Sequence, residues 1–205
     1  RDHPYKLVKD KNTGEVLSHE TIFELTCKHT LRGLQEATQG ANLVEHGRWV
    51  SVRLPGCKLW FVGEIDIEAG GVVEIKTKWI SPSNAKQGFN IKSLPREPDK
   101  WHVRQVALYW KFMREQAENV PVKIVYANMK GWRVFSSEDC PALSEGSLSN
   151  ALNWLAAEAR SRENILSRAA DERELFKLVS SESDHWMWSN AAPELKQLRD
   201  QLWGI

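Results

Sequence analysis

Two apolar runs on either side of a glycine-rich turn constrain the fold of this chain most strongly. The first run ends at Ile67 and the second begins at Val72. Side chains alternate between the two faces of a strand, so a three-residue loop, Ala69-Gly70-Gly71, places Asp66 opposite Glu74. A two-residue loop would set acids against apolar residues, which a half-buried sheet does not tolerate. The pattern therefore predicts a β-hairpin with two carboxylates side by side.

The same register determines which side chains share a face of the hairpin. It pairs Ile67 with Val73 and Ile65 with Ile75, so that the apolar partners all lie on one face. Lys76 then shares the acidic face. Carboxylate oxygens suit hard cations such as Mg²⁺ or Mn²⁺, and a neighbouring ammonium group can orient a water or hold a phosphate. We interpret this face as a site for phosphodiester cleavage; the alternative is the solvated face of an ordinary hairpin.

A predicted helix downstream brings two more polar side chains together. Pro98-Asp99 is typical of a helix start, Pro121 stops the helix, and no glycine lies between, so we expect a helix over residues 99–119. Gln105 and Tyr109 are four residues apart and therefore lie on one face of this helix. The helix thus presents an amide and a phenol side by side.

Three motifs in this order resemble the PD-(D/E)xK nuclease superfamily. They are Gly-x-x-Asp, Glu-x-Lys and Gln-x-x-x-Tyr, which end at Asp66, Lys76 and Tyr109. The most similar branch contains RecB-type helicase-nucleases, lambda-type phage exonucleases and the mitochondrial genome-maintenance exonuclease. The resemblance covers more than half of the chain, although Ile65 stands where the superfamily has its proline, a position that is permissive in this branch. It implies an α/β fold with a restriction-endonuclease-like core, in which helices flank a central mixed β-sheet, and here a C-terminal helical extension.

The resemblance also implies a role for each motif residue. The expected metal ligands, for one or two Mg²⁺ or Mn²⁺ ions, are His29, Asp66, Glu74 and the main-chain carbonyl of Ile75. Lys76 would stabilise the attacking hydroxide or the scissile phosphate. Gln105 and Tyr109 would orient Lys76 or the nucleophile and contact DNA.

Two histidines upstream of the hairpin are candidates for the remaining metal ligand. Ser18 can cap a helix that runs to about Gln39. Its inward stripe consists of Ile22, Leu25, His29 and Gly33. A histidine on an apolar face is more often a hydrogen-bonded core residue than a ligand, but the family context favours His29. His46, before the next apolar run, is the second candidate.

The charge distribution favours a nucleic-acid partner. The net charge is only +1, but residues 76–114 hold nine Lys or Arg and two acids, so this segment carries +7 and the remainder −6. A long aperiodic segment from residue 78 to 101 follows the Glu-x-Lys strand, and we expect it to wrap DNA, with Trp79, Phe89 or Trp101 available to stack on a base. The candidate DNA-binding residues are Lys78, Trp79, Lys86, Lys92, Arg96 and Arg104.

Composition sets the outer limits of the interpretation. The length of 205 residues suits a single nuclease domain, residues 1–205, with a core over about 17–140 and a helical part over about 144–205. We expect a second hairpin over 122–129 and 131–136, helices over 148–179, and a last helix over 193–202. Three scattered cysteines favour a reducing compartment and exclude an iron–sulfur cluster, which needs four thiolates.

The function predicted from these features is a metal-dependent DNA exonuclease that acts at DNA ends in recombination, repair or DNA processing. No apolar run approaches the ~20 residues that span a bilayer, so no membrane partner is expected. The cytoplasm of a bacterial or phage-infected cell is favoured over the mitochondrion. The partners expected are single- or double-stranded DNA ends, with a homo-oligomer or a recombination partner protein left open. The alternatives are an endonuclease of the same fold, restriction or structure-specific, and a non-catalytic DNA-binding relative.

Overall fold

A computed structural model describes residues 7–9, 14, 16–41, 45–77, 94–171, 174–175 and 191–203. The chain divides into two compact units. One comprises residues 1–52 with 60–153, and the other comprises residues 53–59 with 154–205. The larger unit contains the sheet and every predicted catalytic residue.

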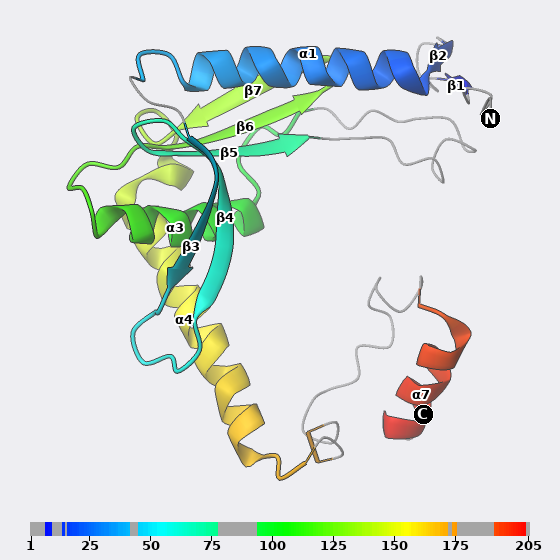
Figure 1. Ribbon diagram of the computed structural model, residues 1–205, viewed down its shortest axis with the longest axis vertical. Helices are drawn as coiled ribbons and strands as arrows, with labels where there is room; N and C mark the ends of the chain where they lie inside the picture. Colours follow the sequence, from blue (N-terminus) through cyan, green and yellow to red (C-terminus); the bar gives the residue numbers. More distant parts are fainter. Residues whose placement is uncertain are drawn as a thin grey trace. The chain divides into compact units, whose positions relative to one another are not determined.

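The larger unit is built on a five-stranded mixed sheet (Figure 1). Its strands, in spatial order, are β3 (Glu45–Val52), β4 (Phe61–Glu68), β5 (Val72–Thr77), β6 (Val122–Asn128) and β7 (Gly131–Ser136). Strands β5 and β6 are parallel, and the other neighbours are antiparallel. A small antiparallel pair, β1 (Leu7–Lys9) and β2 (Val16–Ser18), precedes the sheet. The predicted α/β class, with helices flanking a central mixed sheet, and the predicted second hairpin are therefore confirmed.

Helix α1 (His19–Ala37) covers one face of the sheet. Ser18 caps it as predicted, because its hydroxyl accepts a hydrogen bond of 3.0 Å from the amide of Thr21. Gly33 lies where the helix approaches β6 most closely, since a Cβ there would be 2.6 Å from a methyl group of Val125. The glycine of the predicted inward stripe therefore lets α1 pack directly on the sheet.

Helix α3 (Lys100–Arg114) covers the other face. Asp99 caps it, its carboxylate accepting a hydrogen bond of 2.8 Å from the amide of Trp101. The predicted start is correct, but the helix ends five residues before the predicted residue 119. The carbonyl of Pro121 accepts a hydrogen bond of 2.9 Å from the amide of Val72. Pro121 therefore lies beside the start of β5, and residues 115–120 have to connect it to the end of α3. A helix that continued to residue 119 would prevent this connection.

The β4–β5 hairpin has the predicted loop but a shorter ladder. Ile67 pairs with Val73, and residues 69–71 form the loop, as predicted. Beyond Ile67 the ladder ends, and β4 curves away from β5 across α3 (Figure 1). Ile65 packs in the core around α3, whereas Ile67 packs against the cluster beneath α1. The prediction that Ile65 shares a face with Ile75 is therefore wrong.

The bend in β4 has a cause in the neighbouring strand. Gly47 of β3 has a φ of +70°, in the left-handed region that favours glycine. The pairs on either side of it, His46 with Ile67 and Arg48 with Ile65, place Gly47 beside Asp66. The bend therefore falls at the acid of the Gly-x-x-Asp motif.

The remaining elements are a 3₁₀ turn, η1 (Pro141–Leu143), and two helices, α4 (Glu145–Arg168) and α7 (Pro193–Trp203). Helix α4 starts in the larger unit and ends in the smaller one. In the smaller unit the carboxylate of Glu163 accepts hydrogen bonds from the amides of Lys58 and Leu59. Of the one or two helices predicted over 148–179, one is observed from 145 to 168; residues 172–173 and 176–179 lie outside the described part. The predicted last helix is confirmed. No described helix is both long and apolar enough to cross a membrane.

Candidate functional site

The structure brings the five predicted catalytic residues together on the α3 side of the sheet. Asp66 comes from β4, Glu74 and Lys76 from β5, and Gln105 and Tyr109 from α3. A continuous set of hydrogen bonds joins the last four. Because β5 and β6 are parallel, a crossover connection has to join them. Helix α3 belongs to this connection and places Gln105 and Tyr109 on the same side of the sheet as Glu74 and Lys76.

Glu74 is the most unusual residue of the site, because it is an acid with only 1% of its surface exposed. One carboxylate oxygen, Oε1, accepts a hydrogen bond from Nζ of Lys76. The other, Oε2, is buried and has no hydrogen-bond partner among the described residues. Burial above all, together with the nearby charge of Asp66, raises the pKa of Glu74 to about 7, against the lowering effect of Lys76. A buried acceptor without a partner is costly, so this oxygen is suited to a cation.

The side chain of Lys76 is held by two acceptors. Besides Glu74, its Nζ donates a hydrogen bond of 2.9 Å to Oε1 of Gln105. The amide nitrogen of Gln105 donates in turn to the hydroxyl of Tyr109, at 3.0 Å. The amide of Gln105 is therefore oriented at both ends, with its oxygen toward the lysine and its nitrogen toward the phenol. In the described part of the chain these two acceptors use two of the three ammonium hydrogens of Lys76, so the third can serve a ligand.

Tyr109 connects the helix to the Gly-x-x-Asp motif. Its ring packs on Gly63, where a Cβ would lie 2.8 Å from Cε1 and 3.0 Å from the hydroxyl oxygen. The hydroxyl also accepts a hydrogen bond from the backbone amide of Glu64, and burial raises the pKa of Tyr109. The glycine of the motif is thus needed because α3 presents a tyrosine to the strand at that point.

Asp66 is tied to β5 although the strand ladder has ended. Its Oδ2 accepts a hydrogen bond of 2.8 Å from the amide of Ile75. The side chain therefore replaces a missing strand partner and is held next to Glu74. Since the amide and carbonyl of one strand residue point to the same side, the carbonyl of Ile75 is directed toward the same edge of β5.

The donor atoms at this edge fit a hard divalent cation. They are carboxylate and main-chain carbonyl oxygens of Asp66, Glu74 and Ile75, the ligand types that Mg²⁺ and Mn²⁺ prefer. The buried Oε2 of Glu74 is the observation that favours such an ion. Within the described ranges there is no group of three or more His, Cys, Asp and Glu side chains placed to hold a metal ion, so His29 does not join the two acids.

His29 lies against the β6–β7 hairpin. Its Nδ1 donates a hydrogen bond of 2.9 Å to the carbonyl of Asn128, and its ring centroid is 5.7 Å from that of Trp132. His29 is thus half-buried and hydrogen-bonded to the backbone, which is close to the core histidine that the sequence left open as the alternative. Its role as a metal ligand stays a prediction. His46 is exposed on β3.

Two of the candidate DNA-binding residues flank the start of α3. Arg96 is exposed, and the guanidinium of Arg104 lies 4.4 Å from the ring centroid of Trp101, itself 62% exposed. Trp101 is one helical turn before Gln105, so it extends the stripe that faces the site. Four further candidates lie outside the described residues, namely Lys78, Trp79, Lys86 and Lys92.

Two supporting residues are absent from the sequence prediction. The hydroxyl of Tyr126 accepts a hydrogen bond of 3.0 Å from the amide of Asp99 and contacts Nδ1 of His102 at 2.7 Å. Tyr126 is the β6 partner of Lys76, and burial raises its pKa to about 12. These contacts fix the start of α3, and hence Gln105, to the sheet. The register between β5 and β6 cannot be read from the sequence, so no signal was available for them.

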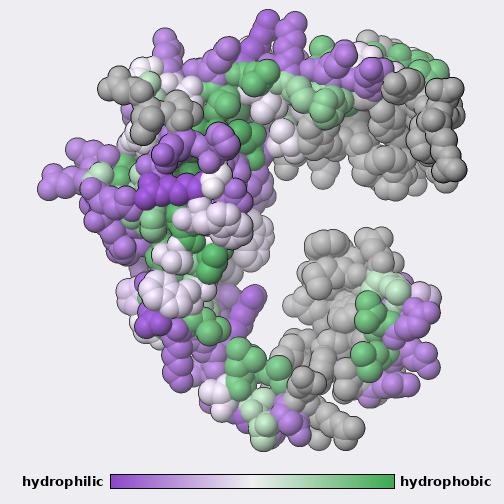
Figure 2. Space-filling view, in the orientation of Figure 1, coloured by the Kyte–Doolittle hydropathy of each residue, from purple (hydrophilic) through white to green (hydrophobic). Residues whose placement is uncertain are grey.

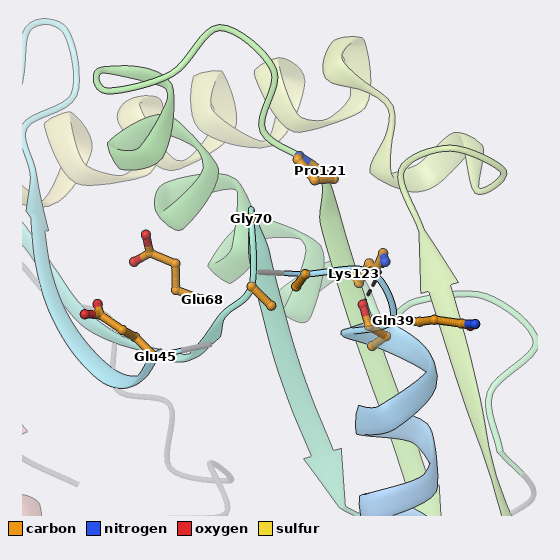
Figure 3. A pocket seen from close by; sticks show the side chains of 10 residues that line it. Gln39, Glu45, Glu68, Gly70, Pro121 and Lys123 are labelled. Atoms are coloured by element: carbon orange, nitrogen blue, oxygen red, sulfur yellow. Dashed lines mark hydrogen bonds between the residues drawn. The ribbon is translucent and has the colours of Figure 1, made fainter. Parts of the chain in front are cut away.

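A pocket of about 460 Å³ lies elsewhere on this unit (Figure 3). It is lined by the end of α1, the β4–β5 turn and the start of β6, with Glu45 and Glu68 on one side. Nζ of Lys123 donates a hydrogen bond of 2.7 Å to the carbonyl of Ala37, which satisfies the C-terminus of α1. None of the five predicted catalytic residues lines this pocket, so it is separate from the site.

The site is therefore a buried acid, a second acid fixed to the adjacent backbone, and a lysine oriented by an amide and a phenol. This arrangement can hold a cation and a negatively charged substrate group next to each other. Comparisons with protein-family models, with curated proteins and with solved structures found no match to this chain.

Proposed function

We propose that this chain is a metal-dependent deoxyribonuclease that hydrolyses phosphodiester bonds, with the restriction-endonuclease-like core of the PD-(D/E)xK nucleases. One observation carries the proposal: the buried carboxylate of Glu74 is bonded to Lys76 through one oxygen, while its other oxygen has no partner in the part of the chain that the structure describes. Asp66 is near enough for its charge to raise the pKa of Glu74. Two acids can hold the divalent cation that such hydrolysis uses, and a lysine beside them can hold the phosphate.

Asp66, Glu74 and the carbonyl of Ile75 would hold Mg²⁺ or Mn²⁺. When bound, the ion supplies a Lewis acid that stabilises charge on the phosphoryl oxygens and makes water a better nucleophile. Glu74 has to be ionised to serve as a ligand. Since its pKa is about 7, it takes up this role with the release of a proton near neutral pH.

Lys76 would act on the substrate rather than on the ion. Glu74 and Gln105 accept two of its hydrogens, so the third is directed by the same contacts. It can donate to a non-bridging oxygen of the scissile phosphate or to the attacking water, and its charge stabilises the anion that forms there. Gln105 and Tyr109 are positioning residues for this lysine.

DNA is the proposed substrate because the basic excess of the chain follows the site. The positive segment, residues 76–114, starts at Lys76 and includes all of α3. The stacked pair of Arg104 and Trp101 offers a charge for a phosphate and an exposed ring for a base. Action at DNA ends, in recombination, repair or DNA processing, is proposed from the motif resemblance.

The test is cleavage of a linear duplex and of a matched covalently closed circle, each with Mg²⁺, with Mn²⁺ and with EDTA. Lys76→Ala is compared with Lys111→Ala, which removes a lysine on α3 whose ion pair among the described residues is with the exposed Glu115. We expect metal-dependent loss of the linear DNA alone, abolished in Lys76→Ala and retained in Lys111→Ala. Cutting of the circle would make the protein an endonuclease, and absence of cleavage of every substrate would refute the catalytic proposal.

A further inference from the structure

Strand β7 adds an arginine to the face of the sheet that carries the site. Arg133 is the strand partner of Tyr126, and Tyr126 is the strand partner of Lys76, so the three residues form one row across β5, β6 and β7. Residues paired in this way point to the same face of a sheet. The packing agrees, because Phe135, two residues after Arg133, lies in the α3 core with its ring edge-on to that of Tyr126. Arg133 therefore lies on the same face as Lys76, although it belongs to none of the three motifs.

The row sets the distance between the two cationic residues. Neighbouring strands are about 4.8 Å apart, so two strand spacings separate the Cα atoms of Lys76 and Arg133 by about 10 Å. A DNA strand rises about 3.4 Å per nucleotide in a duplex, so this separation corresponds to about two or three nucleotides. One strand can therefore have a phosphate at Lys76 and another at Arg133.

The first turn of α3 lies between these two cations. The amide of Asp99 donates a hydrogen bond of 3.0 Å to the hydroxyl of Tyr126, and Tyr126 is fully buried beneath it. In this turn Trp101 is 62% exposed, and the guanidinium of Arg104 lies 4.4 Å from the centroid of its ring. A strand that crosses from the site to β7 therefore passes over an exposed aromatic ring and a further cation, both of which suit DNA.

Arg133 is held beside a second exposed arginine. Its Nη1 donates a hydrogen bond of 2.6 Å to the carbonyl of Pro95, and the next residue is Arg96. Both arginines are exposed, and within the described ranges neither forms an ion pair with a carboxylate. A guanidinium carries five N–H donors in a planar fork, so Arg133 can bind Pro95 and still bind a phosphate through other hydrogens. The pair is thus suited to an anionic group.

The opposite face of the sheet has a different charge pattern. Helix α1 covers that face, and hydrophilic groups lie along its outer side (Figure 2). Its charged residues are of both signs, namely Glu20, Glu24, Lys28, Arg32 and Glu36. Arg32 lies over the ring of Trp132, the β7 residue next to Arg133 that points to the α1 side. Arg32 is therefore a matched arginine close to β7 but on the wrong face for the site.

We propose that Arg133, together with Arg96, binds a backbone phosphate of DNA about two or three nucleotides from the phosphate held at Lys76. The proposal rests on the proposed function for the identity of the ligand, and it adds the direction in which the strand leaves the site, across β6 and β7 over the start of α3. Arg133 is a binding residue in this arrangement and takes no part in the chemistry.

Binding is measured by fluorescence anisotropy in EDTA at several NaCl concentrations, with a labelled oligothymidylate and a labelled blunt duplex. The variants are Arg133→Ala, Arg133→Lys, and Arg32→Ala as the control that removes the same charge from the other face. Each phosphate contact adds about 0.7 to the slope of log affinity against log salt for single strands, and about 0.9 for duplex DNA. We expect Arg133→Ala to lower the slope by about one contact and to weaken binding at least about fivefold. Arg133→Lys keeps most of the slope, and Arg32→Ala keeps both slope and affinity.

Cleavage with Mg²⁺ is measured on the same preparations, so that the two proposals are tested separately. If the wild type cleaves DNA but Arg133→Ala changes slope and affinity no more than Arg32→Ala does, the phosphate contact at Arg133 is overturned. If the wild type cleaves nothing but Arg133→Ala loses one contact in the slope, the phosphate contact stands and the nuclease proposal fails. A wild type that binds neither DNA would overturn both. Equal unfolding temperatures of the variants ensure that a loss of binding is not a loss of fold.

Discussion

The ring of Tyr109 lies against the backbone of Gly63 with no room for a side chain between them. This contact joins two sequence motifs through Gly63 and Tyr109, which are 46 residues apart in the chain. It explains why a tyrosine on α3 and a glycine on β4 occur together here. The same tyrosine accepts the hydrogen bond that orients Gln105, so the packing contact also supports the position of Lys76.

Gly63→Ala is therefore expected to damage both the fold and the site. The new methyl group would be 2.8 Å from Cε1 of Tyr109, so the ring has to move and its bond to Gln105 lengthens. We expect a loss of about 1–3 kcal/mol in the free energy of unfolding, measured with urea, together with a lower rate of DNA cleavage. Gly146→Ala is the control, because nothing lies within 4 Å of a Cβ at that helical position. Equal stability of wild type and Gly63→Ala would show that the contact is not tight.

The pH dependence of stability is expected to reveal the buried acid. The pKa of Glu74 is raised from 4.5 to about 7 in the folded state, so between these values the folded protein keeps a proton that the unfolded chain loses. Stability therefore falls as pH rises through this window, by up to about 3 kcal/mol. Glu74→Gln removes the effect. Urea unfolding of both proteins at pH 4.5 to 8, without metal, tests this, and parallel curves for the two would contradict it.

The parts of the fold that were predictable depend on local patterns. The β4–β5 loop follows from period-two alternation around Gly70, and the starts of α1 and α3 follow from the caps Ser18 and Asp99. The end of α3 was not predictable, because it is set by the tertiary contact between Pro121 and the start of β5.

The proximity of the candidate residues was predictable from the sequence, but their geometry was not. The register brought Asp66 to the side of Glu74, yet the two do not form a ladder pair, since the bend depends on the left-handed conformation of Gly47 in the neighbouring strand. Asp66 instead bonds to the amide of Ile75. Oε2 of Glu74 is buried without a partner among the described residues because α3 packs over this part of the sheet. The alternation of apolar and polar residues along a strand does not predict such tertiary packing.

Cation binding is expected to be detectable without any DNA. A Mn²⁺ concentration about ten times the dissociation constant stabilises a protein by about 1.4 kcal/mol, which raises the Tm of a chain this long by about 3–6 °C. We expect this shift at pH 8, a smaller one at pH 6 where Glu74 is largely protonated, and none in Asp66→Asn or Glu74→Gln. Differential scanning calorimetry measures it, with Ser147→Ala as a control remote from the acids. A full shift in Glu74→Gln would place the cation elsewhere.

His29→Ala distinguishes a structural histidine from a metal ligand. Its Nδ1 bonds to the carbonyl of Asn128 and its ring packs near Trp132, so the substitution leaves an acceptor without its partner and a gap beneath α1. We expect a loss of about 1–3 kcal/mol in the free energy of unfolding, because a part-buried hydrogen bond and packing are removed together. The Mn²⁺ shift in Tm is expected to persist, since His29 is not grouped with the two acids in the described part of the chain. The opposite result, a stable His29→Ala protein that no longer responds to Mn²⁺, would establish His29 as a ligand and would require α1 to approach the site when the ion binds.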